Sequence, residues 1–327
     1  MQELWGILLA FYKLFIKKGE SVLKKGIPFL FIVIFFFLIV GCSTNASDST
    51  QPEAATDNDH EETEAEEEEE HRIVATTVAA TEMFDALKLD LVGIPTSYKD
   101  LPERYDGLTK VGNPMSPDME LIKSLKPTDV YSVTTLQTDL EDVFNSVDVN
   151  GTFMDLQSVE GVLQELLNLG ETFNREEQAE KIVSDIEQRF AEIEEAAAGE
   201  ETPSVLVLMG VPGSYLVATE HSYIGNLVKR AGGENIVHGE DVEYLASNTE
   251  YLQQSNPDII LRAAHGMPDE VVEMFDKEFK TNDIWKHFNA VKNNRVYDLP
   301  EPLFGTTGNL KIAEAMDALV DMLYPEL

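Results

Sequence analysis

Residues 158–199 read SVEGVLQELLNLGETFNREEQAEKIVSDIEQRFAEIEEAAAG, and nearly the whole stretch has the apolar spacing of helices. Leu163 and Leu166 share one face in its first part, and Ile186 lies on the apolar face of its second part. Gly170 is a candidate break between two helical segments. We therefore expect a long helical element that separates the parts of the chain on either side of it.

On the N-terminal side of this element, short apolar runs alternate with helical patterns. The runs IVATTV at 73–78, LVGI at 91–94 and DVYSV at 129–133 are typical of strands. The segments AATEMFDALKL at 79–89 and SPDMELIKSL at 116–125 have the spacing of helices. Strands that alternate with helices predict a parallel sheet with crossover helices.

On the C-terminal side, SVLVLMG at 204–210 starts the same pattern again. The sequence therefore predicts an α/β protein of two lobes joined by one helical connector. Neither a dinucleotide glycine fingerprint nor a phosphate-binding loop is present, so a nucleotide role has no support. The expected boundaries are an export segment at 1–41, an acidic spacer at 42–71, an N-terminal lobe at 72–157, a connector at 158–202 and a C-terminal lobe at 203–327.

An export signal precedes the predicted lobes. Lys24 and Lys25 form a basic flank, and the apolar stretch from Ile27 to Val40 spans 14 residues, fewer than the ~20 that a membrane-spanning helix needs. The sequence IVGC that ends at Cys42 resembles the bacterial lipobox, in which the cysteine becomes the lipidated N-terminus. The alternative is an uncleaved anchor helix. Both interpretations hold the rest of the chain to the membrane, outside the cytoplasm.

The first residues of the chain fit a signal poorly, because they carry their own apolar patch, LWGILLAFYKLF, at 4–15. Codons for the tripeptide KGE at 18–20 can contain AAGGAG, a ribosome-binding sequence. We therefore hypothesise that translation starts near Val22 or Leu23 and that residues 1–20 are not translated. Peptides from residues 1–20 in the unprocessed precursor would exclude this hypothesis.

The segment STNASDSTQPEAATDNDHEETEAEEEEE, residues 43–70, has too few bulky apolar side chains to fold on its own. Repulsion between its carboxylates favours an extended spacer between the lipid anchor and the lobes. The alternative is a metal-collecting tail that uses His60, His71 and the glutamate run.

Composition excludes several classes of function. The chain has 60 acidic and 24 basic residues, and its formal net charge of −36 argues against binding to nucleic acid or adsorption to anionic lipid. Cys42 is the single cysteine, so a disulfide framework and a cysteine-based zinc or iron–sulfur site are unavailable.

Four segments, in order along the chain, resemble the substrate-binding lipoproteins of iron-siderophore, cobalamin and haem importers. They are HRIVATTVAATEMFDALKLDLVGIPTSY at 71–98, MELIKSLKPTDVYSV at 119–133, LVKRAGGENIV at 227–237 and SNTEYLQQSNPDIIL at 247–261. This resemblance implies a class III substrate-binding protein, with two Rossmann-like lobes on a rigid helical connector and a ligand in the cleft between them. Such a connector limits lobe closure, so we expect small changes in shape when ligand binds.

Two further segments make the resemblance more specific. VGNPMSPDMELIKSLKP at 111–127 and LRAAHGMPDEV at 261–271 resemble the haem-binding member of the iron-regulated surface determinant (Isd) systems of Gram-positive bacteria. The implied ligand is haem, iron protoporphyrin. The implied partners are an ABC permease with its cytoplasmic ATPase, and cell-surface proteins that donate haem.

The residues themselves agree with this implication. Met115 lies between two prolines in a loop that enters a helix, and His265 leaves a predicted strand. Loops of this kind gather at the carboxyl ends of parallel strands, where α/β proteins bind ligands. An imidazole and a thioether are a suitable axial pair for haem iron, and filling both axial positions leaves no open site for oxygen chemistry. The alternatives are a core methionine and a structural histidine.

Haem also carries two propionates, for which helix N-termini offer unpaired N–H groups and a favourable dipole. The turn at Thr76, Thr77 and Val78 and the helix start at Tyr223 are candidates. Tyrosines in loops also pack without binding ligand, and Met267 competes with its neighbour as a ligand or lines the pocket. The complete set of expected pocket residues is Thr76, Thr77, Val78, Met83, Tyr98, Tyr215, Tyr223 and Met267.

The family resemblance also implies one acidic residue on each lobe that meets arginines of the permease. By position in the motif, Glu250 matches the residue of the second lobe. Asp139 and Glu141 are the candidates in the first lobe. The alternative for each carboxylate is a solvated surface position.

Other functions on the same fold stay open from the residues alone. A ferric-siderophore, cobalamin or zinc carrier is the nearest alternative, and Arg262 keeps the siderophore interpretation possible. Zinc needs three or four histidine or carboxylate ligands. No nucleophile–base set or paired carboxylate motif supports an enzyme.

Overall fold

The computed structural model describes residues 71–247, 252 and 255–326. The chain divides into two compact units, 1–65 and 66–327, and every described residue belongs to the second. The expected export segment, Cys42, the acidic spacer before residue 71 and Glu250 all lie outside the described residues. Within the described ranges, no helix combines the length and apolarity needed to cross a membrane.

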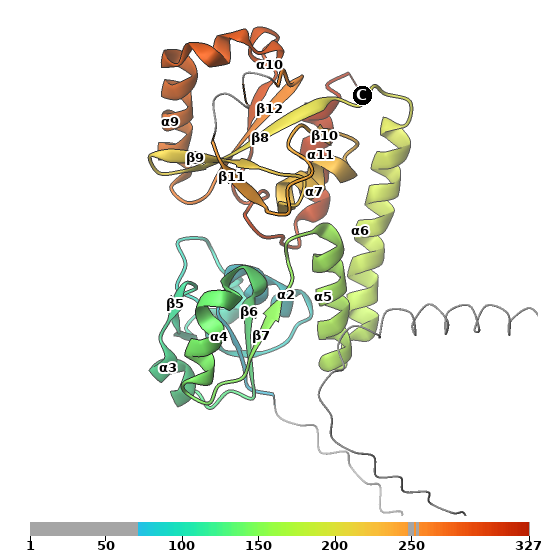
Figure 1. Ribbon diagram of the computed structural model, residues 1–327. Helices are drawn as coiled ribbons and strands as arrows, with labels where there is room; N and C mark the ends of the chain where they lie inside the picture. Colours follow the sequence, from blue (N-terminus) through green and yellow to red (C-terminus); the bar gives the residue numbers. More distant parts are fainter. Residues whose placement is uncertain (1–70, 248–251, 253–254, 327) are drawn as a thin grey trace, which may run out of the picture. The chain divides into compact units, whose positions relative to one another are not determined.

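The first lobe is built on a five-stranded, fully parallel sheet in the order β3-β2-β1-β6-β7. Between β3 and the helix that follows it, the strands β4 and β5 form a tight antiparallel hairpin. The elements are β1 Ile73–Ala75, α2 Val78–Ala86, β2 Leu91–Ile94, η1 Glu103–Tyr105, β3 Thr109–Lys110, β4 Gly112–Asn113, β5 Ser116–Pro117, α3 Met119–Ser124, β6 Asp129–Val133, η2 Thr134–Leu136, α4 Gln137–Asn145 and β7 Gly151–Met154 (Figure 1).

The second lobe has a six-stranded mixed sheet in the order β11-β9-β8-β12-β13, with β10 paired to β8. The sequence pattern predicts parallel strands only. In the structure β9 runs antiparallel to both of its neighbours, β8 and β11, because the chain turns back directly after β8 in a short hairpin. The elements are β8 Ser204–Val211, β9 Ser214–Ala218, α7 Tyr223–Arg230, β10 Glu234–Asn235, β11 Tyr244–Ala246, β12 Ile259–Ala264, α9 Pro268–Thr281, η3 Asp283–His287, α10 Asn289–Lys292, β13 Val296–Asp298 and α11 Ile312–Leu323.

Two helices connect the lobes, α5 Val159–Thr172 and α6 Glu176–Ala197. The break between them is not at Gly170, which lies inside α5. A Cβ atom at Gly170 would come within 2.6 Å of the Ala179 side chain, so glycine is required for close packing of the two helices. The chain reverses instead at Asn174, which has a positive φ of 53°.

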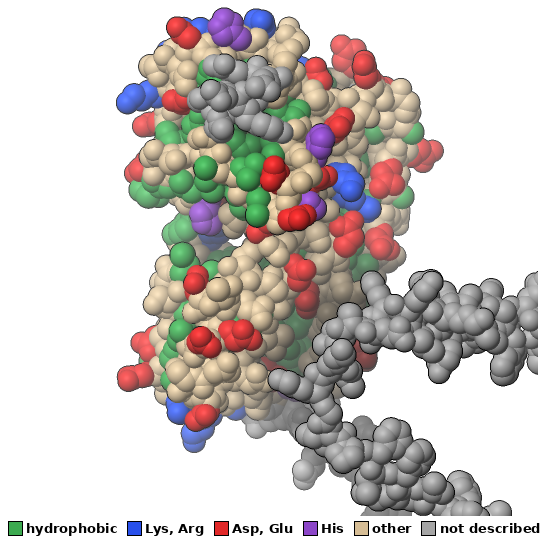
Figure 2. Space-filling model, in the orientation of Figure 1, with side chains coloured by type: hydrophobic (Ala, Val, Ile, Leu, Met, Phe, Trp, Pro, Cys, Tyr) green, Lys and Arg blue, Asp and Glu red, His purple; other side chains and the backbone are tan. Residues whose placement is uncertain are grey.

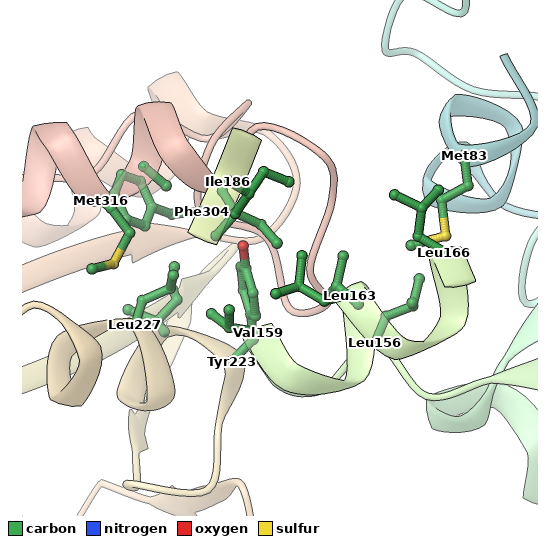
Figure 3. Packing of buried hydrophobic residues seen from close by; sticks show 14 of the residues in the cluster. Met83, Leu156, Val159, Leu163, Leu166, Ile186, Tyr223, Leu227, Phe304 and Met316 are labelled. Carbon is green, nitrogen blue, oxygen red and sulfur yellow. The ribbon is translucent and has the colours of Figure 1, made fainter. Parts of the chain in front are cut away.

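One continuous hydrophobic core runs through both lobes along α5. Val159 and Leu163 of α5 lie near Tyr223 of the second lobe, and Leu166 lies beside Met83 of the first (Figure 3). All of these side chains are buried. Burying one such side chain stabilises the fold by about 1.5–3 kcal/mol. Separating the lobes from α5 would therefore lose the burial free energy of several side chains.

Backbone contacts fix the start of α5 to the second lobe as well. The Val159 N–H donates to Oδ1 of Asn226 at 2.9 Å, and the Gly308 N–H donates to the Leu156 carbonyl at 2.7 Å. A Cβ atom at Gly308 would lie 2.4 Å from the Val162 side chain, so this approach depends on glycine. The connector is therefore held by apolar packing and by directional hydrogen bonds together.

Replacing Leu166 with alanine should lower the free energy of unfolding by about 2–5 kcal/mol, because the substitution leaves a cavity in the shared core. Denaturant titration of the soluble protein that begins after Cys42 measures this change. Gln164→Ala, on the exposed face of the same helix, is the control and should change stability by less than about 0.5 kcal/mol. Equal losses for the two variants would show that α5 is not a core helix.

Candidate ligand site

Met115 lies at the tip of the β4–β5 hairpin, and 69% of its surface is exposed. The Met115 N–H donates to Oδ1 of Asn113 at 2.9 Å, and the Asp118 N–H closes the hairpin onto the Val111 carbonyl at 2.7 Å. Gly112 has a φ of +104°, and a Cβ atom there would come within 3.0 Å of the backbone at Asp118. The hairpin therefore presents a thioether to solvent on a defined turn, which excludes the interpretation of Met115 as core filler.

His265 follows β12 directly. Its N–H donates to the Gly210 carbonyl of β8 at 2.8 Å, which continues the pairing of the two strands by one residue. Gly266 and Met267 then both adopt positive φ, 73° and 47°, and Pro268 begins α9. This sharp turn leaves the imidazole accessible at the carboxyl end of the sheet, with Met267 53% exposed beside it.

The surroundings of His265 favour the neutral imidazole. Desolvation by neighbouring atoms lowers its pKa below the usual value, and the positive charge of Lys99 lowers it further. Glu301 acts in the opposite direction. The neutral form has a free ring nitrogen, which is the form that binds metals.

Glu301 connects the two lobes. It follows β13, the neighbour of β12, and its Oε1 lies 2.7 Å from Nζ of Lys99 in the first lobe. The Tyr98 hydroxyl donates to the same oxygen at 3.1 Å. Tyr98 and Lys99 follow β2, so the carboxyl ends of the two sheets meet through these loops.

The Met115 hairpin belongs to the same network of loops. Strands β2 and β3 are parallel neighbours, and the Thr96 N–H donates to the Gly112 carbonyl at 2.8 Å. The hairpin is thus tied to the loop that carries Lys99, and Lys99 acts electrostatically on His265. Figure 2 shows an opening between the upper and lower halves of the molecule, with histidine, basic and hydrophobic side chains at its margin.

A further carboxyl lies in this region. Glu82 of α2 is half-buried, and burial raises the pKa of its carboxyl, while Lys311 of the second lobe and Lys99 oppose that rise. Sequence reasoning did not identify Lys99, Glu301, Glu82 or Lys311. Nothing in the local sequence distinguishes them from the many other charged residues of the chain.

The predicted turn at the start of α2 lies at the carboxyl end of β1. Thr76 is buried and donates through Oγ1 to the Tyr131 carbonyl at 3.0 Å. Thr77 is the N-cap of α2, and its hydroxyl accepts from the Ala80 N–H at 3.2 Å. Both threonine side chains therefore serve the fold, and Val78 is the partly exposed first residue of the helix.

Three other expected pocket residues have structural roles. Met83 and Tyr223 have no exposed surface and belong to the shared core, so the prediction that they contact a ligand is wrong. Tyr215 is half-buried, and its ring centroid lies 5.8 Å from that of Phe275 and 6.1 Å from that of Trp285. Tyr98, in contrast, is 72% exposed beside the cross-lobe contact.

The residues expected to meet a permease are partly described. Asp139 and Glu141 are both exposed on α4 of the first lobe, and Gln137 donates to the Glu141 carboxylate at 3.4 Å. Glu250, their expected counterpart in the second lobe, is outside the described residues.

Arg262 is engaged within its own lobe and offers little to a ligand. Only 8% of its side chain is exposed, and its guanidinium donates to both carboxylate oxygens of Asp298 at 2.8 and 2.5 Å and to Asp276 at 3.1 Å. It also stacks over the rings of Phe275 and Phe279. Its role is therefore to join β12, β13 and α9.

Among the residues that the structure describes, no three histidine, cysteine or acidic side chains come together in a group that could hold a metal ion. The donors accessible at the strand ends include one imidazole, His265, and the thioethers of Met115 and Met267, beside the exposed phenol of Tyr98. These are donors that suit an iron already held by a macrocycle.

Comparison with known proteins agrees with the two-lobed α/β fold. Residues 73–303 match the family model described as periplasmic binding protein. The chain is 51% identical over 256 residues to the "High-affinity heme uptake system protein IsdE" of Staphylococcus aureus, covering 78% of this chain and 88% of that protein.

Two solved structures are also similar. The haem complex of S. aureus IsdE is 52% identical with a TM-score of 0.75, covering 78% of this chain and 99% of that one. An ABC transporter substrate-binding protein from Listeria monocytogenes is 57% identical with the same TM-score and the same coverage.

In the ligand-free protein, NMR titration of the His265 ring should give a pKa below the ordinary 6.5. Lys99→Met should raise that pKa, because it removes a positive charge that disfavours the imidazolium. Glu301→Gln should lower it, because it removes a negative charge that favours the imidazolium. Shifts in the opposite directions would show that neither group faces His265.

Proposed function

The chain belongs to the periplasmic binding protein family, and we propose that it is the haem-binding component of an ABC-type importer outside the cytoplasm. The observation that carries this proposal is the placement of an exposed methionine and an accessible histidine at the carboxyl ends of the two sheets. The similarity to the S. aureus haem-uptake protein, at 51% identity, supports the same ligand.

In this proposal Met115 and His265 hold haem iron from opposite faces of the macrocycle. The two side chains belong to different lobes and to loops joined through the Lys99–Glu301 contact. A neutral imidazole donates a lone pair directly, and a thioether adapts to a soft axial position. With both axial positions filled, the protein carries haem and does not use it for catalysis.

The propionates of haem would lie at the start of α2. The backbone N–H groups of Val78 and Ala79 precede the first N–H that is capped by Thr77, and they lie at the carboxyl end of β1. The favourable dipole of a helix N-terminus lets a strongly acidic protein bind an anionic group at this position. Tyr98 and Met267 are exposed at the strand ends and would line the macrocycle.

The runner-up is a carrier for a ferric siderophore, cobalamin or zinc. The siderophore interpretation is weakened by Arg262, whose guanidinium is bound by Asp298 and Asp276. Titration of the soluble protein with hemin, a ferric hydroxamate siderophore, cobalamin and Zn²⁺ separates these ligands directly. Binding of hemin alone supports the proposal.

Transport places the protein at the outer face of a Gram-positive cell membrane. Cys42 would carry the lipid anchor, and residues 43–70 would act as the spacer. Cell-surface donor proteins would deliver haem, and Glu250 with Asp139 or Glu141 would meet arginines of the permease. A cytoplasmic ATPase would drive the release of haem into the permease.

Loading the soluble protein with hemin should give the absorption spectrum of a six-coordinate haem. Met115→Ala and His265→Ala should each change this spectrum and weaken hemin binding by at least about 10- to 100-fold, because each removes an axial ligand. Absorption spectra and hemin competition measure both effects.

Met119→Ala provides the matched control, because Met119 belongs to α3, four residues after the hairpin tip. It should leave the spectrum unchanged. Met267→Ala should also leave the spectrum unchanged, which excludes Met267 as the axial sulfur. A wild-type spectrum from Met115→Ala would contradict the proposed ligation.

Cys42→Ala should abolish lipidation, because the thiol is the site of acylation. In a Gram-positive host fed a clickable palmitate analogue, the wild-type protein should be labelled in the membrane fraction. The variant should be unlabelled and remain as the longer precursor. Equal labelling of both forms would contradict Cys42 as the lipidated residue.

A further inference from the structure

We propose that Tyr98, Lys99 and Glu301 form a latch between the two lobes that sets the width of the gap in which Met115 and His265 face the ligand. These three would be positioning residues. Their role in ligand retention rests on the proposed function, whereas the latch itself consists of contacts between residues of the two lobes.

The contacts of the latch are short and partly shielded from water. Glu301 Oε1 accepts from Lys99 Nζ at 2.7 Å and from the Tyr98 hydroxyl at 3.1 Å. The Glu301 side chain is 12% exposed and that of Lys99 is 33% exposed. An ion pair with this burial is screened less by salt than a fully solvated pair.

The loops on both sides of the latch are fixed by hydrogen bonds within their own lobes. In the first lobe, the Lys99 N–H donates to Oγ of Ser97 at 2.8 Å, and Thr96 is bonded to the Met115 hairpin. In the second lobe, the Leu299 N–H donates to the Arg262 carbonyl at 2.9 Å. The Lys99–Glu301 contact therefore fixes the distance between the loop that follows β2 and the loop that follows β13.

The charges around Glu82 agree with this arrangement. Lys311 of the second lobe and Lys99 of the first both lower the pKa of the Glu82 carboxyl, which burial raises. Opposite charges that face each other between the lobes favour one register, because displacement of the lobes separates them.

The latch has a consequence for binding. The shared core along α5 restrains the lobes on the connector side, and the latch restrains them on the side where the strands end. A ligand would therefore enter a gap whose width is already set, and binding would require less ordering of the protein.

The experiment measures the spacing of the lobes without ligand. The soluble protein that begins after Cys42 has no native cysteine, so Glu120→Cys and Glu273→Cys, exposed on α3 and α9, place one nitroxide on each lobe. Double electron–electron resonance should give a narrow distance distribution. Lys99→Glu and Glu301→Lys should each broaden it, and the double charge-swap variant should restore it.

Hemin dissociation gives the second measurement. Each single variant should release hemin about fivefold faster or more, and the swap should recover most of that loss. Lys181→Glu, which breaks an exposed ion pair with Asp185 within α6, is the control and should change neither measurement.

Unchanged distance distributions in both single variants would overturn the latch, whatever the hemin result. A swap that restores the spacing but not hemin retention would overturn its role in retention and would assign Lys99 to the ligand itself. The expected distance distributions in a protein that does not bind hemin would support the latch. That result would count against the proposed function only.

Discussion

The hydrophobic core that α5 shares with both lobes is the constraint on which the rest of the structure depends. Leu166 and Val159 lie on one helix, yet the first packs beside Met83 of the first lobe and the second near Tyr223 of the other. Apolar interiors are close-packed, so the lobes cannot separate along this helix without opening voids. This continuity lets the strand ends keep a fixed relation to each other.

That scaffold permits side chains and backbone conformations at the strand ends that do not stabilise the fold. An exposed methionine on a two-residue turn and a histidine followed by two residues of positive φ contribute little to stability by themselves. They persist because Gly112, Asp118 and the β8–β12 pairing hold their backbones. The Lys99–Glu301 ion pair joins the two lobes beside these residues. Apolar packing therefore holds the scaffold together, and electrostatic contacts position the loops of the site.

The sequence predicts what is periodic and misses what depends on distant contacts. The helices of the connector and strand β12, which delivers His265, follow from local spacing and are confirmed by the structure. Met83 and Tyr223 were expected near ligand because each follows a strand–helix turn, but spacing does not say which face of a helix meets the core. The hydrogen bond between Tyr98 and Glu301 joins residues 203 positions apart, so no local sequence pattern predicts it.

X-ray absorption at the iron edge of the hemin complex tests the ligation by Met115 and His265 most directly. We expect six ligand atoms around iron, one sulfur and five nitrogens. Met115→Ala should remove the sulfur, and His265→Ala should leave it. A set of iron ligands with no sulfur, or with a sulfur that survives in Met115→Ala, would contradict this ligation.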